Sequence, residues 1–287
     1  MKEITGHTKL TGLLGSPVAH SISPMMHNEA FRRLDLDYAY LAFDVAPEQL
    51  KVAVEGLKAM GVRGFNLTMP HKTAMAHLAD ELSPAAKLCG AVNTVVNDNG
   101  VLKGYTTDGI GYMRAAADAG HPLPGKTMTI LGAGGAATAI IAQATLDGLK
   151  EIRVFNRKSP TYEKAEAFIE QVRHQTGCPV TLHDLEDEDA LGESILSSDI
   201  LTNSTNVGMA PREDGCLIRD TSVFHPGLVV SDIIYNPRET ALMRLARSCG
   251  CEAFNGLYML LYQGAESFRL WTGMDMPVEA IKEKYFL

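Results

Sequence analysis

The first hundred residues alternate between short apolar runs and stretches in which apolar residues recur every three to four positions. Short runs are typical of buried strands, and the longer spacing is typical of helices that bury one face. Ser23 is a favourable N-cap, and Pro24 suits the first helical position. Strands that alternate with helices favour a mostly parallel sheet. The predicted strands cover residues 10–15, 38–45, 64–68, 91–97 and 101–105, and the predicted helices begin at residue 23 and cover 47–60.

A turn-rich segment at residues 121–125 interrupts this alternation, and the pattern then restarts. The second series predicts an independent doubly wound unit. From Leu257 to Trp271, apolar residues form a helical stripe that we expect to pack on the first domain. We therefore expect an α/β protein with one domain in residues 1–108, completed by C-terminal helices in 256–287, and a second domain in 109–255. The second domain has predicted strands at residues 127–131, 152–155, 180–182, 200–203 and 228–233 and predicted helices at 136–146 and 162–174.

The charge balance limits the classes of partner. The 287 residues carry 34 acidic and 26 basic side chains, a net charge of −8. A nucleic-acid surface needs clustered Lys and Arg to neutralise phosphates, so we expect no nucleic-acid partner. The apolar runs fall far short of the roughly 20 residues that cross a bilayer, so we expect no membrane span.

The five cysteines are scattered along the chain, and their odd number does not predict a disulfide framework. Cys249-Gly250-Cys251 lacks a second pair, and none of the nine histidines shows metal-ligand spacing. We therefore expect no metal. Unpaired cysteines predict a reducing, cytoplasmic location.

A glycine-rich segment directly follows the predicted strand at 127–131. Residues 132–137 match the pattern G-x-G-x-x-A with one additional glycine, and a predicted helix follows them. The first glycine permits a tight turn, the second lets the backbone approach a pyrophosphate, and the small last residue lets the helix lie close to the strand. The free N–H groups at the helix start attract phosphate. The segment predicts a Rossmann-type domain with a dinucleotide loop at Gly132, Ala133, Gly134, Gly135 and Ala136.

The next predicted strand ends at the sequence Asn156-Arg157-Lys158-Ser159. An NAD site usually carries Asp or Glu about 20 residues after the loop, where the carboxylate binds the ribose hydroxyls. No acidic residue is found at this strand end. Arg157 and Lys158 can meet a 2′-phosphate instead, and Arg157 can also stack on adenine.

A lysine and an aspartate in the first domain suit proton transfer. Lys72 follows a predicted strand at the expected start of a helix, where a positive charge is locally unfavourable. Asp108 lies further along the chain and can pair with Lys72 to hold its geometry. A proton-transfer pair combined with a dinucleotide predicts hydride transfer between a nicotinamide and a small alcohol or ketone.

Several short motifs occur in a fixed order along the chain. They are Ser21-x-Ser23-Pro24, residues 64–72 (GFNLTMPHK), residues 90–94 (GAVNT), Thr107-Asp108-Gly109, the glycine loop, Asn156-Arg157, Tyr235-Asn236-Pro237 and Gln263-Gly264-Ala265. With these motifs the chain resembles the shikimate dehydrogenase family over nearly its whole length. Residues 80–88, 126–128 and 271–273 are most similar to the quinate/shikimate dehydrogenase branch.

The resemblance implies an NAD(P)-dependent enzyme that interconverts 3-dehydroshikimate and shikimate, and 3-dehydroquinate and quinate, in a cleft between a substrate domain and a Rossmann-type domain. Lys72 and Asp108 match the catalytic pair, and the Lys72 ammonium would stabilise the developing alkoxide and donate the proton. The implied substrate-binding residues are Ser21, Ser23, Thr68, Lys72, Asn93, Asp108, Tyr235 and Gln263. The implied cofactor-binding residues, besides the glycine loop, are Asn156, Arg157, Lys158, Ser159, Thr205, Asn206, Ile233, Tyr235 and Gly256.

Three positions depart from the family patterns that select the cofactor. NADP-selective members carry a second Arg where this chain has Thr161. The quinate/shikimate branch carries Asp in place of Ser159 and Lys in place of Asn206. NAD and NADP both stay open, and we favour NAD because Ser159 can accept a hydrogen bond from ribose and only one side of the phosphate clamp is present.

Two other functions stay open. A dinucleotide-sensing regulator would keep the fold without the chemistry, although Lys72 and Asp108 are both present. A dehydrogenase of a related ring substrate, such as aminoshikimate or a folate derivative, is the second, but no aromatic slot for a pterin is evident. A homodimer is a further expectation, because two-fold assemblies are the most common ones.

Overall fold

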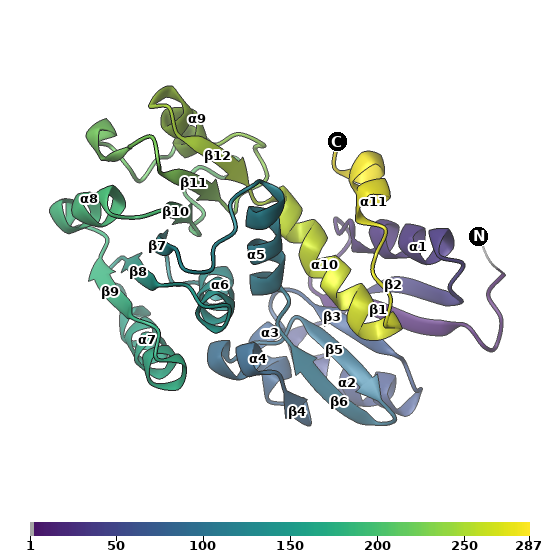
Figure 1. Ribbon diagram of the computed structural model, residues 1–287. Helices are drawn as coiled ribbons and strands as arrows, with labels where there is room; N and C mark the ends of the chain where they lie inside the picture. The colour runs from purple at the N-terminus through teal and green to yellow at the C-terminus, as the bar shows by residue number, and fades with distance from the viewer. Residues whose placement is uncertain (1–2) are drawn as a thin grey trace. The chain divides into compact units, whose positions relative to one another are not determined.

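The computed structural model describes residues 3–287, which form two compact units (Figure 1). Unit 1 comprises Met1–Asp108 and Leu261–Leu287, and unit 2 comprises Gly109–Leu260. Each unit has its own six-stranded sheet. The α/β class predicted from the alternation of strands and helices is confirmed.

The strands of unit 1 form a mixed sheet in the order β2-β1-β3-β5-β6-β4. Three neighbouring pairs are parallel, whereas β5 is antiparallel to both of its neighbours. The reason is the hairpin of β5 and β6, whose turn residues Asn99 and Gly100 both have positive φ, as a two-residue type I′ turn requires. The strands are β1 (Lys9–Gly15), β2 (Tyr38–Asp44), β3 (Gly64–Leu67), β4 (Glu81–Leu82), β5 (Thr94–Asp98) and β6 (Val101–Tyr105).

The helices of unit 1 differ from the predicted ones in detail. Ser23 is the first residue of its helix rather than the N-cap, which is Ile22. The Ser21 hydroxyl accepts a hydrogen bond from the Ser23 N–H at 3.2 Å, so the serine two residues earlier satisfies a free N–H. The helices are α1 (Ser23–Arg33), the 3₁₀ turn η1 (Pro47–Gln49), α2 (Leu50–Ala59), α3 (Lys72–Ala76), α4 (Pro84–Cys89), the part of α10 (Leu257–Thr272) from residue 261 onward, and α11 (Val278–Tyr285).

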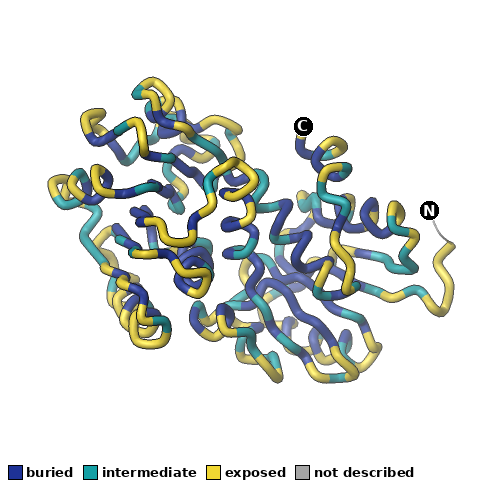
Figure 2. The backbone as a smooth tube through the Cα atoms, viewed as in Figure 1, coloured by how far each residue is buried: buried dark blue, intermediate teal, exposed yellow. Residues whose placement is uncertain are grey.

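The C-terminal segment of unit 1 packs against its sheet. Trp271 is fully buried, and its indole N–H donates to the Val95 carbonyl at 2.9 Å. A Cβ at Gly64 would lie 2.3 Å from the Trp271 Nε1, so only glycine leaves room for the indole. Figure 2 shows the strands of this unit as mostly buried and the connecting turns as mostly exposed.

Unit 2 has a fully parallel sheet in the order β12-β11-β10-β7-β8-β9. The chain passes from β7 outward through β8 and β9, and then returns to the other side of β7 as β10. This reversal is the topological switch point, where doubly wound folds bind dinucleotides at the carboxyl ends of the strands. The strands are β7 (Thr127–Leu131), β8 (Glu151–Asn156), β9 (Val180–Asp184), β10 (Ile200–Asn203), β11 (Val229–Asp232) and β12 (Glu252–Asn255).

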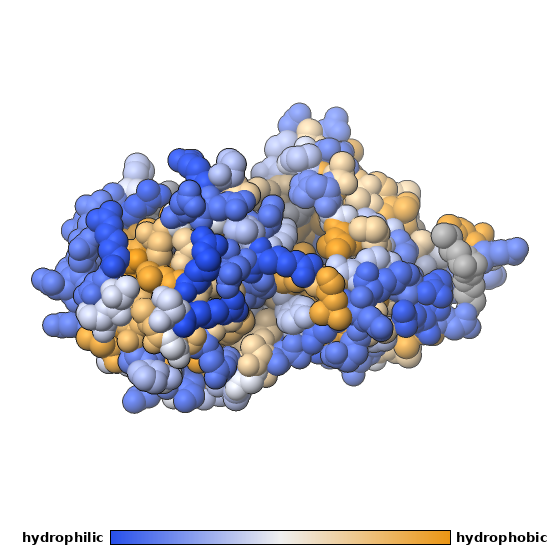
Figure 3. Space-filling model, turned by 90° about the horizontal axis from the view of Figure 1, so that it is seen from above, coloured by the Kyte–Doolittle hydropathy of each residue, from blue (hydrophilic) through white to orange (hydrophobic). Residues whose placement is uncertain are grey.

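The predicted helices of unit 2 are present. The unit also contains helices that the sequence pattern does not predict. Short helices have too few turns, and short edge strands too few residues, for a period in their apolar positions to be recognised. Figure 3 shows hydrophilic residues over most of the viewed face of the molecule. Among the described helices, none has the length and apolar character needed to span a bilayer. The helices are α5 (Asp108–Asp118), α6 (Gly135–Leu146), α7 (Tyr162–Thr176), α8 (Glu188–Leu196), the 3₁₀ turn η2 (Thr221–Val223) and α9 (Ala241–Ser248).

Candidate active site

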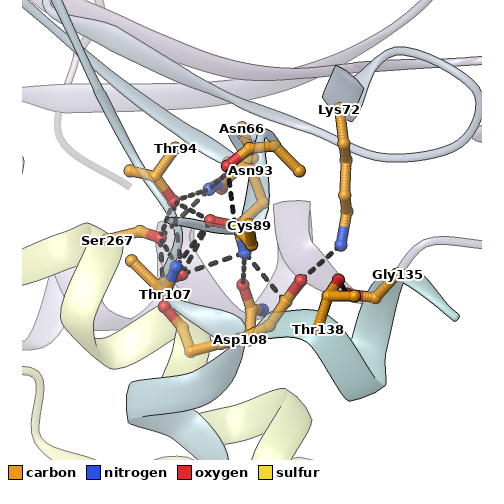
Figure 4. A network of polar contacts seen from close by, with 12 residues as sticks. Asn66, Lys72, Cys89, Asn93, Thr94, Thr107, Asp108, Gly135, Thr138 and Ser267 are labelled. Carbon is orange, nitrogen blue, oxygen red and sulfur yellow. Dashed lines mark hydrogen bonds and ion pairs between the residues drawn. The ribbon is translucent and has the colours of Figure 1, made fainter. Parts of the chain in front are cut away.

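Lys72 and Asp108 form an ion pair in unit 1 (Figure 4). Lys72 is the first residue of α3, after β3, and Asp108 is the first residue of α5, after β6. The Lys72 Nζ lies 2.6 Å from the Asp108 Oδ2. The lysine side chain is 35% exposed and the aspartate side chain 14%. The ammonium is therefore accessible to a ligand while its partner is largely shielded and fixed.

Asn93 orients the carboxylate of this pair. Its Nδ2 donates to the Asp108 Oδ1 at 2.8 Å and lies 3.0 Å from the Thr107 Oγ1 and 3.5 Å from the Gln263 Oε1. Its Oδ1 accepts from the Thr107 N–H at 2.8 Å. Both oxygens of Asp108 are thus engaged, and Asn93 is joined to Gln263, another predicted substrate-binding residue.

A buried polar network lies behind Asn93 (Figure 4). The Asn66 Nδ2 lies 3.0 Å from both the Thr94 Oγ1 and the Ser267 Oγ, and the two hydroxyls are 2.8 Å apart. The Tyr40 hydroxyl donates to the Asn66 Oδ1 at 2.8 Å, and burial raises the pKa of Tyr40 so that it keeps its proton.

None of these four network residues has a role predicted from the sequence. Asn66 stands within a motif that was noted, and β3–β5 pairing sets it opposite Thr94. Thr94 also stands within a noted motif, residues 90–94, so membership of these motifs is the signal that could have found the two. Ser267 joins them from 201 residues further along the chain, which no local pattern reveals.

The predicted serines and threonine follow the carboxyl ends of β1 and β3. Ser23 is buried and Ser21 half-buried in the segment after β1. Thr68 directly follows β3, and its N–H donates to the Leu14 carbonyl at 2.9 Å. A Cβ at Gly15 would lie 2.2 Å from the Thr68 Cγ2, so the glycine lets the end of β1 pass close to this threonine.

The glycine loop of unit 2 connects β7 to α6 at the switch point. Gly132 has φ +97°, a conformation that favours glycine, and its N–H donates to the Phe155 carbonyl at 2.7 Å. Gly134 and Gly135 have no positive φ, and a Cβ on either would meet nothing within 4 Å. Neither strain nor packing requires glycine at these two positions. Their backbone at the start of α6 therefore fits a pyrophosphate that approaches closely.

A second loop of unit 2 follows β10 and is held by a buried carboxylate. The Asn203 Nδ2 donates to the Asp232 Oδ1 at 3.1 Å, and the Asn203 Oδ1 accepts from the Thr205 hydroxyl at 2.7 Å. The same Asp232 oxygen accepts from the Ile234 N–H at 3.1 Å. Burial raises the pKa of Asp232, and these hydrogen bonds oppose that shift. Asn203 and Asp232, which the sequence analysis did not single out, thus organise the strand ends near Thr205 and Ile233.

The other predicted residues of this region differ in exposure. Tyr235 is 47% exposed and Asn206 is exposed, so both side chains are open to a ligand. Gly256 is buried, and a Cβ there would lie 1.9 Å from the Ile233 carbonyl oxygen. Gly256 therefore lets its own segment lie directly against Ile233.

The predicted cofactor residues after β8 meet an acidic residue from the next strand. Asp184 ends β9 and is the register partner of Asn156, which ends β8. The Lys158 Nζ lies 3.2 Å from the Asp184 Oδ2. The Ser159 hydroxyl lies 2.9 Å from the Thr161 Oγ1, and Arg157 is exposed. The end of β8, which has no acidic residue of its own, thus has the Asp184 carboxylate beside it.

Within residues 3–287, no group of three His, Cys, Asp or Glu side chains is placed to hold a metal ion. The five cysteines are all free. Burial is the largest influence on four of them, Cys89, Cys178, Cys216 and Cys251, and raises the pKa of each thiol.

Three family models match successive parts of the chain. The shikimate dehydrogenase substrate binding domain matches residues 13–95, shikimate / quinate 5-dehydrogenase matches 114–223, and the shikimate 5'-dehydrogenase C-terminal domain matches 256–284. A shikimate dehydrogenase (NADP(+)) of Listeria monocytogenes serotype 4b is 53% identical over 99% of this chain and 98% of its own length. A quinate/shikimate dehydrogenase of Escherichia coli O139:H28 is 48% identical over 98% of each chain.

A solved structure agrees with these sequence comparisons. The crystal structure of shikimate 5-dehydrogenase from Listeria monocytogenes in complex with shikimate and NAD is 53% identical to this chain. The match covers 99% of this chain and 98% of that one, with a TM-score of 0.96. Motif order, fold and full-length similarity agree, and this chain belongs to the shikimate dehydrogenase family.

Proposed function

We propose that this protein is an NAD(P)-dependent oxidoreductase that interconverts 3-dehydroshikimate and shikimate, and acts on the quinate pair as well. The observation that carries the proposal is the Lys72–Asp108 ion pair, oriented by Asn93. Relatives that span the whole chain are named shikimate and quinate/shikimate dehydrogenases. The domain roles follow: residues 1–108 with the C-terminal helices of 256–287 bind substrate, and residues 109–255 bind the dinucleotide.

Lys72 handles the proton in this proposal. In the direction of reduction, its ammonium donates a hydrogen bond to the carbonyl oxygen at C3, stabilises the negative charge that develops there and then gives the proton to it. Asp108 holds the Nζ in place and balances its charge. The nicotinamide, when bound, supplies the hydride in reduction and accepts it in oxidation. In oxidation, Lys72 takes the proton from the hydroxyl.

The substrate presents several hydroxyls and a carboxylate, which need oriented partners. A site built to bond these hydroxyls discriminates strongly against analogues that lack them, because its polar groups are then left unpaired. We propose that the groups that bind substrate are Ser21, Ser23, Thr68, Lys72, Asn93, Asp108, Tyr235 and Gln263.

The dinucleotide requires a phosphate cradle and contacts to both of its nucleosides. The open backbone of Gly134 and Gly135 at the start of α6 supports the phosphate position. We propose as cofactor-binding residues Gly132, Ala133, Gly134, Gly135, Ala136, Asn156, Arg157, Lys158, Ser159, Thr205, Asn206, Ile233, Tyr235 and Gly256.

The test is the initial rate of oxidation of shikimate and of quinate, each with NAD and with NADP, followed by nicotinamide absorbance. Oxidation of shikimate with at least one cofactor is expected. If folded protein oxidises neither substrate, the proposal fails. Binding of dinucleotide without turnover would then favour the sensing regulator, and turnover of aminoshikimate alone would favour the related dehydrogenase.

Two further expectations belong with this function. A homodimer predicts a mass near twice that of one chain by light scattering, and a monomer mass at micromolar concentration would contradict it. A cytoplasmic location predicts that the cysteines stay reduced in cells.

A further inference from the structure

The end of β8 has a carboxylate beside it that sequence spacing does not reveal. β8 and β9 are parallel, and Asn156 and Asp184 are their last residues and direct register partners. The Leu185 N–H donates to the Asn156 carbonyl at 3.0 Å, which fixes the two strand ends against each other. In doubly wound folds, the adenosine ribose lies at the end of the second strand, here β8. Asp184 therefore occupies the region where an acid of β8 itself would otherwise stand.

Asp184 is held as a carboxylate. Its Oδ1 accepts from the Glu186 N–H at 3.1 Å, and its Oδ2 is the atom 3.2 Å from the Lys158 Nζ. The backbone hydrogen bond and the lysine lower the pKa of Asp184 below its ordinary value. The side chain is only 22% exposed, whereas that of Lys158 is 71% exposed.

The groups around Asp184 offer little positive charge to offset its repulsion of a 2′-phosphate. Lys158, one of the two cations after β8, is neutralised by Asp184. The Ser159 hydroxyl accepts from the Thr161 N–H at 3.4 Å in addition to its contact with the Thr161 hydroxyl. Thr161 itself brings no charge. Arg157, which is exposed, is then the cation left to meet a 2′-phosphate.

We propose that Asp184 selects the cofactor: it disfavours the 2′-phosphate of NADP by its charge and by holding Lys158, so that the enzyme prefers NAD. A carboxylate accepts hydrogen bonds from ribose hydroxyls and repels a phosphate at the same place. The inference rests on the proposed function only in that a nicotinamide dinucleotide binds to unit 2.

The experiment measures the dissociation constants of NADH and NADPH by the change in their own fluorescence, with no substrate present. The wild-type protein is expected to bind NADH more tightly. Asp184→Asn is expected to shift the NADPH:NADH affinity ratio towards NADPH by about tenfold, the size of one lost charged contact. Lys158→Gln is expected to shift the ratio the opposite way, because it leaves Asp184 uncompensated.

The control is Glu166→Gln on α7, an exposed residue that changes the net charge of unit 2 by the same amount. It is expected to leave the ratio within about twofold, as surface substitutions do. A folded Asp184→Asn protein, verified by thermal melting, whose ratio matches the control would overturn the inference, as would tighter wild-type binding of NADPH. Failure of shikimate oxidation with a shifted binding ratio would instead overturn the proposed substrate and leave this inference intact.

Discussion

At the scale of single residues, hydrogen bonds fix the geometry of the Lys72–Asp108 ion pair. Asp108 has an ion pair on one oxygen and the Asn93 amide on the other, so its carboxylate has little freedom to rotate. The Lys72 ammonium is therefore also held in position, because it contacts this carboxylate. Preorganised groups of this kind act without reorganising during the reaction.

Replacement of Asn93 tests this constraint. Asn93→Ala removes a donor from the Asp108 Oδ1 and the acceptor of the Thr107 N–H. We expect kcat for shikimate oxidation to fall by roughly 10- to 100-fold and KM to rise, since a hydrogen bond to a charged group is worth about 1.5–3 kcal/mol. The steady-state rate at saturating cofactor measures the change.

Asn99→Gly is the matched control for Asn93. Asn99 lies in the β5–β6 turn with φ 53°, which glycine adopts freely. Its kcat should stay within about twofold of the wild type. A kcat for Asn93→Ala as high as that of the control would show that Asn93 does not position the pair.

At the scale of elements, α10 packs closely on the sheet of unit 1 because Gly64 has no side chain. Gly64 begins β3, and the Trp271 indole occupies the space that a Cβ would need while it donates to Val95 on β5. The same helix brings Ser267 to the network behind Asn93. The packing of α10 thus affects the site as well as the core.

Gly64→Ala is expected to lower the free energy of unfolding by about 1–3 kcal/mol, the usual cost of overpacking a core. Trp271 is the only tryptophan, so its fluorescence in a urea titration reports unit 1. Gly56→Ala in α2 is the control, because a Cβ there meets nothing within 4 Å. It should be neutral or stabilise by up to roughly 1 kcal/mol, as alanine favours helices over glycine. Equal effects of the two substitutions would refute the packing argument.

At the scale of the whole molecule, a buried carboxylate on α1 pairs with a lysine of the C-terminal helix α11 and makes the stability of the fold depend on pH. Glu29 on α1 accepts from Arg32, Arg33 and, 255 residues away, Lys284 on α11. Chiefly through the hydrogen bond from Arg32, followed by that from Lys284, the pKa of Glu29 is lowered from 4.5 to about 2. A lowered pKa stabilises the fold fully above the unfolded value, and the contribution is lost as the pH falls through the folded value.

Comparison of Glu29→Gln with the wild type isolates this contribution. At pH 6 the variant should be less stable by on the order of 1 kcal/mol, since its partners are partly exposed and screened. The difference should shrink between about pH 4.5 and pH 2. Chemical denaturation at a series of pH values measures it, and a difference that is constant with pH would contradict the assignment to Glu29.

The sequence predicted much of the fold because most elements carry a strong local signal. The strands β7 and β10 have the predicted bounds, and the glycine loop follows β7 as its spacing requires. The sequence did not reveal what depends on pairing between distant strands. Asp184 lies beside the end of β8 through register, and Ser267 meets Asn66 through the docking of a helix. Both contacts are set by tertiary structure, which neither periodicity nor motif spacing contains.

The most direct test of the account is the rate of shikimate oxidation by Lys72→Ala, with the dissociation constant for shikimate measured alongside. We expect kcat to fall by about 10²–10⁴-fold, the usual contribution of a general acid–base group, with shikimate binding largely kept. Lys87→Ala, which replaces an exposed lysine of α4, should match the wild type. A Lys72→Ala enzyme that turns over at the wild-type rate would contradict the central claim that this lysine carries the proton.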